Sequence, residues 1–81
     1  MKENTVGDVM RWLGFHPCVI FNAGINGTVL VERRGVRGQV LGTLLPCGEE
    51  FWMIEAIDGV VDNTPRTFLG AATQVAASWG F

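Results

Sequence analysis

Two similar stretches in the middle of the chain place the strongest constraint on its fold. The segments "GINGTVL" at 24–30 and "GVRGQVL" at 35–41 share the pattern G-[IV]-x-G-x-V-L, eleven residues apart. A repeat architecture would need units of about 20 residues or more. The short spacing is instead typical of successive hairpin turns with similar chemistry, in which glycine supplies positive φ angles. The pattern therefore predicts an antiparallel β-meander.

The segments between these turns are rich in β-branched and aromatic residues, which is typical of strands. The expected strands cover residues 18–22, 28–33, 39–45 and 50–57. The last of them, "EFWMIEAI", is apolar on both faces except at Glu55, which predicts a central, covered position. The following "VVDNTPR" is interpreted as a short extended piece only. Because the gaps are short, neighbouring strands are expected to be antiparallel.

Apolar residues at spacings of three and four predict one helix at each end of the chain. The first covers residues 5–14 and the second begins near residue 66 and ends at Gly80. The apolar stripe of the second helix consists of Phe68, Ala72, Val75, Ala76 and Trp79. Trp79 is therefore expected in the core. The predicted fold is a single α+β domain over residues 1–81, in the order α-β-β-β-β-α, with both helices on one face of a four-stranded antiparallel meander sheet.

The composition limits the class of protein. Of the 81 residues, 48% are hydrophobic and 17% are charged, which argues against disorder. This balance indicates a single domain that leaves some apolar surface exposed for a partner. The net charge of −2 argues against a free-standing nucleic-acid-binding protein, because basic residues supply most of the affinity of such proteins. No apolar run reaches the roughly 18 residues of a membrane span, and no signal peptide is visible, so we expect a cytoplasmic protein.

Few residues have the types and spacing that catalysis requires. Cys18 lies two residues from His16, but Pro17 separates them and no third group orients the pair. Cys18 and Cys47 are expected to be reduced thiols, with a disulfide as the alternative. Glu55 is interpreted as an outward-facing strand residue, or as the partner of an arginine on a neighbouring strand. The sequence therefore predicts no enzymatic activity, no cofactor and no metal site.

Basic residues gather in the stretch "VERRGVRGQV", where Arg33, Arg34 and Arg37 surround a predicted hairpin tip. Three interpretations remain open: a solvated polar turn, an anchor for a protein partner, or a ribbon that contacts nucleic acid. Trp12 falls off the apolar face of the first predicted helix, and an exposed tryptophan beside Arg11 is a credible interface anchor. The candidate partner-binding residues are therefore these two and the three arginines of the hairpin.

The overall profile resembles that of small accessory proteins of phages and mobile elements, including inhibitors of bacterial defence systems. The resemblance is one of size, acidity and the lack of a catalytic motif. It implies a non-catalytic protein-binding module that inhibits a bacterial host complex. The alternative is a small nucleic-acid-binding or regulatory protein that uses the hairpin of Arg33, Arg34 and Arg37. Both hypotheses are compatible with a homodimer, because a small apolar domain can gain stability by burying a shared surface.

Overall fold

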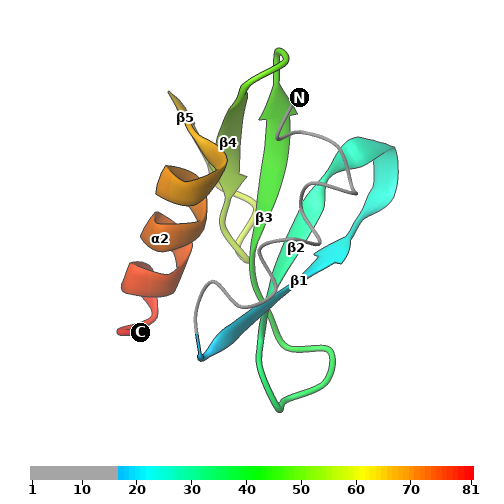
Figure 1. Cartoon of the computed structure of the whole chain (residues 1–81), viewed down its shortest axis with the longest axis vertical. Helices are drawn as coiled ribbons and strands as arrows, with labels where there is room; N and C mark the ends of the chain where they lie inside the picture. The colour runs from blue at the N-terminus through cyan, green and yellow to red at the C-terminus, as the bar shows by residue number, and fades with distance from the viewer. Residues whose placement is uncertain (1–16) are drawn as a thin grey trace.

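The computed structural model describes residues 17–81, which form a five-stranded antiparallel sheet and a C-terminal helix (Figure 1). The strands lie in the sheet in their order along the chain, β1-β2-β3-β4-β5, so the predicted meander order is correct. The bounds are β1 Val19–Ala23, the 3-10 helix η1 Ile25–Gly27, β2 Val29–Arg33, β3 Val40–Cys47, β4 Phe51–Glu55, β5 Val61–Arg66 and α2 Phe68–Ser78.

The prediction of four strands is wrong, because the stretch interpreted as a short extended piece forms β5 at one edge of the sheet. The side chains of β5 are exposed or half-exposed, so its sequence lacks the apolar alternation that identifies a strand. The predicted N-terminal helix over residues 5–14 lies outside the described residues, and α2 is the one α-helix within them. Neither helix of residues 17–81 is long and apolar enough to cross a membrane.

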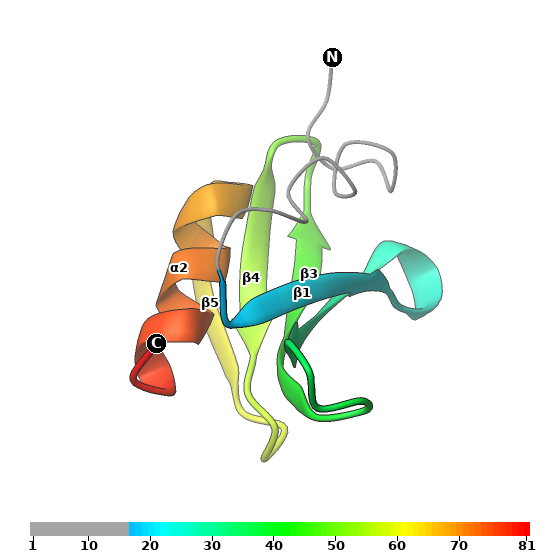
Figure 2. The ribbon, with the colours of Figure 1, turned by 60° about the horizontal axis from the view of Figure 1, so that its bottom comes forward.

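The core lies between α2 and one face of the sheet (Figures 1 and 2). Figure 2 shows β1 running across the direction of β3 and β4, so the sheet is strongly twisted. Phe68, the first residue of α2, is fully buried and packs edge-to-face against Phe21 at 5.2 Å and Trp52 at 5.6 Å between ring centroids. Thr67 caps the helix by accepting a hydrogen bond from the N–H of Gly70 at 3.1 Å. These contacts fix the start of α2 on the sheet.

A bulge in β3 turns two consecutive residues toward the helix. The register between β2 and β3 shifts at Leu41, which has no partner on β2. Leu41 and the adjacent Gly42 are both buried as a result. A Cβ atom at Gly42 would lie 3.1 Å from a methyl carbon of Val75 on α2. The absence of a side chain at this position therefore allows the helix to approach the sheet closely.

The final residues "WGF" end the helix with a Schellman motif. Gly80 has a φ of 78°, and the N–H of Phe81 donates to the carbonyl of Ala76 at 3.0 Å. Phe81 then packs against the core. Trp79 is 38% exposed, so its expected place in the core is wrong. It is the C-cap residue, at the periphery of the helix–sheet contact, and its indole Nε1 donates to the carbonyl of Leu41 at 2.9 Å.

A second irregularity shapes the edge strand β5, whose register against β4 shifts between Asp62 and Arg66. Asp62 Oδ1 accepts a hydrogen bond from the N–H of Thr64 at 3.0 Å, and its Oδ2 accepts one from Arg66 Nη1 at 2.9 Å. The backbone N–H of Thr64, followed by the Arg66 guanidinium, lowers the pKa of Asp62 from its ordinary value. The ionised carboxylate therefore holds the irregular part of β5 together.

Candidate binding groove

The sheet has a second face, which points away from α2. Side chains alternate between the two faces along a strand, so the sequence neighbours of the core residues face outward. This outer face carries Leu30 on β2, Thr43 and Leu45 on β3, and Glu55 on β4, all of them half-buried. This part of the outer face therefore presents two leucines beside Thr43 and the Glu55 carboxylate.

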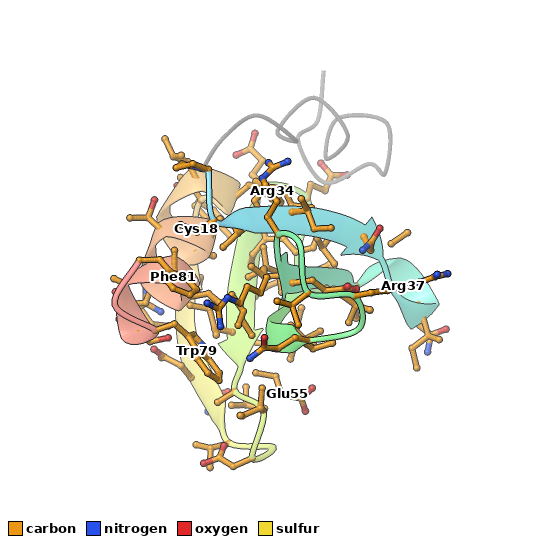
Figure 3. All side chains as sticks on the ribbon, turned by 90° about the horizontal axis from the view of Figure 1, so that it is seen from below. Cys18, Arg34, Arg37, Glu55, Trp79 and Phe81 are labelled. Carbon is orange, nitrogen blue, oxygen red and sulfur yellow. The ribbon has the colours of Figure 1, made fainter. Side chains whose placement is uncertain are left out.

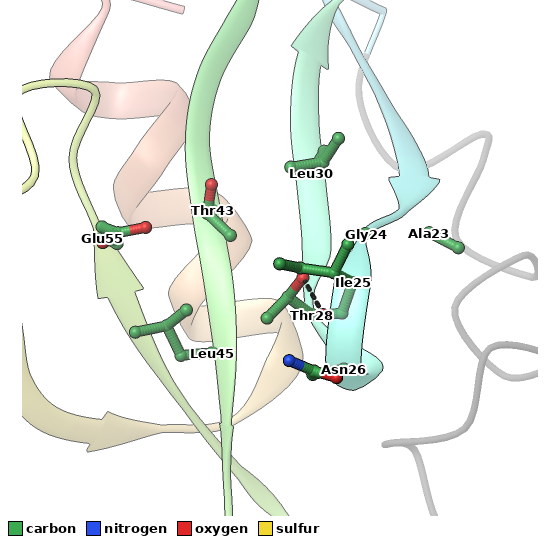
Figure 4. Close-up of a pocket in the computed structure, with 9 residues that line it drawn as sticks. All are labelled: Ala23, Gly24, Ile25, Asn26, Thr28, Leu30, Thr43, Leu45 and Glu55. Atoms are coloured by element: carbon green, nitrogen blue, oxygen red, sulfur yellow. Dashed lines mark hydrogen bonds between the residues drawn. The ribbon is translucent and has the colours of Figure 1, made fainter.

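A first hollow of about 680 Å³ lies on this face, between η1 and the central strands (Figure 4). Its volume falls within the range of about 300–1,000 Å³ that is usual for binding sites. The residues that line it are Ala23, Gly24, Ile25, Asn26, Thr28, Leu30, Thr43, Leu45 and Glu55. Figure 4 shows that the η1 residues form one wall and that Leu45 and Glu55 lie on the other side.

The wall formed by η1 is held in place by hydrogen bonds within the turn. The hydroxyl and the N–H of Thr28 both donate to the carbonyl of Ile25, at 2.7 and 3.0 Å, and the N–H of Gly24 donates to the carbonyl of Thr28 at 2.8 Å. Asn26 and Gly27 take the positive φ angles of 52° and 77° that close the turn. The turn holds Ile25 outward, with 81% of its surface exposed.

A second hollow of about 540 Å³ adjoins the first and shares Leu30, Thr43 and Glu55 with it. It continues to the turn between β4 and β5, where Gly59 has a φ of 86° and Ile57 is 64% exposed. We call the two hollows together the sheet groove. The groove runs from Ile25 at one end to Ile57 at the other, and both ends are marked by a large exposed apolar side chain.

Glu55 lies in the middle of the sheet groove, because it lines both hollows. Its cross-strand neighbours are Thr43 on β3 and Val61 on β5, so the arginine partner considered from the sequence does not face it. Within residues 17–81 the Glu55 carboxylate makes no ion pair and no hydrogen bond. The groove therefore presents a half-buried acceptor that the described part of the chain does not satisfy.

The predicted arginine hairpin forms the connection between β2 and β3. Gly35 and Gly38 have φ angles of 81° and 79°, as expected for glycines in a turn. Arg33, Arg34 and Arg37 are all exposed at this connection, as predicted. The hairpin is thus accessible to solvent, and its contacts decide what each arginine can do.

The three guanidinium groups have different surroundings. Arg33 lies over the ring of Phe81, 5.5 Å from its centroid, and Arg34 Nη2 donates to the carbonyl of Val19 at 3.2 Å. Figure 3 shows Arg34 against β1 and Arg37 projecting elsewhere on the molecule. The fold therefore spreads these side chains over separate places and gives two of them contacts within the chain. Their role in partner binding stays a prediction.

The remaining predicted features concern single residues. Arg11, Trp12 and His16 lie outside the described residues, so the proposed anchor at the first two stays a prediction. Cys18 and Cys47 are not joined by a disulfide in the structure, and the reduced state of the two thiols stays a prediction. Among residues 17–81, no group of three or more histidine, cysteine, aspartate or glutamate side chains could hold a metal ion.

No protein-family model, curated protein or solved structure matches the chain. The sheet groove is therefore interpreted from its own residues. Sequence reasoning singled out Glu55 but missed Ile25 and Ile57. Ile25 lies within the turn "AGING", and Ile57 directly precedes the turn residues "DG". A large apolar residue beside or within a predicted turn is the signal that could have identified them, because a turn seldom buries its side chains.

Proposed function

We propose that this protein is a non-catalytic module that binds another protein through the sheet groove. The observation that carries the proposal is the exposure of Ile25 and Ile57 at the two ends of a mainly apolar groove. Covering apolar surface is favourable by about 25 cal/mol per Å². The domain already has a core of its own, so this second apolar surface is available for a partner.

Nucleic-acid binding through the arginine hairpin receives less support. The chain has a net charge of −2, whereas phosphate binding depends on an excess of basic groups. Arg33 and Arg34 also make contacts within the chain, which a phosphate would have to replace or share. We therefore place the interface at the groove and treat the hairpin as the alternative.

The narrower hypothesis is that the partner is a bacterial host complex and that binding inhibits it. It rests on the small size, the acidity and the lack of a catalytic motif. An inhibitor of this kind needs only a surface that competes with a substrate or an assembly partner. The groove supplies such a surface.

Affinity capture from a lysate of the source organism, followed by mass spectrometry, tests the proposal. The wild type is compared with a double variant, Ile25→Asp with Ile57→Asp, and with the control Leu69→Asp on α2, which also replaces an exposed apolar residue. We expect the wild type and the control to retain the same protein complex and the double variant to lose it. Capture that survives the double variant, or nucleic acid that washes off with salt, contradicts the proposal.

A further inference from the structure

We infer that the sheet groove binds a peptide segment in which a lysine or arginine is flanked by apolar side chains. The basic group pairs with Glu55, and the apolar groups cover the ends of the groove. The inference rests on the proposed function and specifies the chemistry of the partner.

The charge distribution of the groove supports a basic ligand. Glu55 is the one charged side chain among the described residues that line the two hollows. It is half-buried, so part of its water shell is already lost. A lysine or arginine would restore that interaction with a charge-assisted hydrogen bond, which is roughly twice as strong as a neutral one. A phosphate group would instead be repelled by the same carboxylate.

The order of the side chains in the ligand follows from the order in the groove. Ile25 lines only the first hollow, Ile57 lines only the second, and Glu55 lines both. A bound segment that contacts all three must therefore place its basic residue between two apolar ones. Thr43, directly across from Glu55, and Asn26 on η1 add polar groups that can pair with the backbone of the segment.

A peptide fits these features better than a compact ligand. The two hollows adjoin over three strands and share Leu30, Thr43 and Glu55, so a ligand that contacts both must extend across the sheet. The hydrogen-bonded η1 turn keeps Ile25 in its outward position, so little ordering accompanies binding at that end. The combination of two apolar anchors and one ion pair gives both affinity and a defined direction to the bound chain.

The test is a selection of random twelve-residue peptides displayed on a surface, using the full-length protein. Peptides are selected on the wild type and counter-selected on the Ile25→Asp, Ile57→Asp double variant. We expect the enriched peptides to share a lysine or arginine flanked on both sides by apolar residues. The affinity of one such peptide is then measured by fluorescence anisotropy against the wild type and two matched variants. These are Glu55→Gln and the control Glu50→Gln, which changes an exposed carboxylate outside the groove.

We expect Glu55→Gln to weaken binding roughly tenfold, as loss of a hydrogen bond between charged groups does, and Glu50→Gln to leave it unchanged. A peptide with its basic residue replaced by glutamine should bind weakly to the wild type, and its affinity should not change further with Glu55→Gln. This non-additivity is the result that a direct contact between the two charged groups produces in a double-mutant cycle. Circular dichroism and the melting temperature of each variant establish that the fold is retained.

The possible failures of the two proposals are distinguishable. If the selected peptides lack a basic residue, or if Glu55→Gln has no effect, the ion pair is refuted while the groove remains an interface. If no peptide depends on Ile25 and Ile57, or if the double variant dissociates a wild-type homodimer, a partner peptide is not the occupant and this inference is overturned. Capture of the same lysate proteins by wild type and double variant would refute the proposed function itself.

Discussion

Replacement of Trp79 separates two ways in which the end of α2 is attached to the sheet. The indole Nε1 donates to the carbonyl of Leu41, the bulge residue that has no partner on β2. Trp79→Phe removes this donor but keeps most of the aromatic surface, whereas Trp79→Ala removes both. We expect a loss of about 1 kcal/mol in the free energy of unfolding for Trp79→Phe. For Trp79→Ala we expect about 2–4 kcal/mol.

The larger figure follows from the exposure of the side chain. Trp79 is 38% exposed, so roughly three-fifths of it is covered. A fully buried aromatic side chain removes about 150–250 Å² from water, and three-fifths of that is about 90–150 Å². At about 25 cal/mol per Å² this area corresponds to about 2–4 kcal/mol. This area is an upper estimate, because the unfolded chain already covers part of its apolar surface. The lost hydrogen bond adds about 1 kcal/mol, so the two corrections offset each other and the expected total stays at about 2–4 kcal/mol.

Urea denaturation followed by far-ultraviolet circular dichroism measures both losses without relying on tryptophan fluorescence. In a domain of this size, 1 kcal/mol corresponds to a shift of roughly 4–8 °C in melting temperature. Gln74→Ala, a change of a polar residue at an exposed position of the same helix, serves as the control and should stay within about 0.5 kcal/mol. Equal losses for Trp79→Phe and Trp79→Ala, or a loss below about 1 kcal/mol for Trp79→Ala, would refute the packing argument.

Three further outcomes are expected. Gly42→Val should lower the free energy of unfolding by about 1–3 kcal/mol, because the added side chain overpacks the contact with Val75. In denaturant melts, the double variant with Val75→Ala should recover part of this loss. If the losses of the two single variants simply add in the double variant, the close approach of helix and sheet at Gly42 is contradicted. The pKa of Asp62 is lowered in the folded state, so the ionised carboxylate stabilises the fold above its ordinary pKa, and this stabilisation is lost as the pH falls through the lowered pKa. The free energy of unfolding of Asp62→Ala should therefore depend less on pH below about 5 than that of the wild type. Parallel pH profiles of the two proteins would count against this role of Asp62. Arg34→Ala should lose about 0.5–1.5 kcal/mol with its hydrogen bond, while Arg37→Ala should be neutral in the same melts, and the reverse order would be inconsistent with the contacts of the hairpin.

Local features of the fold could be predicted from the sequence. Gly35 and Gly38 occupy the positive φ positions of a turn, and Gly80 ends the C-terminal helix, as their neighbours in the chain indicated. The antiparallel order of the strands followed from the short gaps between them. Each of these features depends on residues a few positions apart, so the sequence contains all the information that decides them.

The sheet groove is only partly visible in the sequence. Glu55 could be singled out, because a carboxylate interrupts an apolar strand. Its lack of a partner among residues 17–81 could not, because that depends on which side chains neighbouring strands place across from it. The same holds for Arg33, whose contact with Phe81 joins residues far apart in the chain.

The sequence by itself determined the turns, the helix end and the antiparallel direction of the strands, since these arise from backbone conformations and side chains within one short segment. Only the tertiary structure decided that β5 joins the sheet, because its exposed residues gain a strand conformation by pairing with β4. It also decided that Trp79 reaches the bulge at Leu41 from the periphery of the core. The residues of β5 do not alternate between apolar and polar side chains, because its strand conformation depends on pairing with β4. The groove likewise depends on which side chains neighbouring strands place next to one another, so neither feature can be predicted from the residues of one segment.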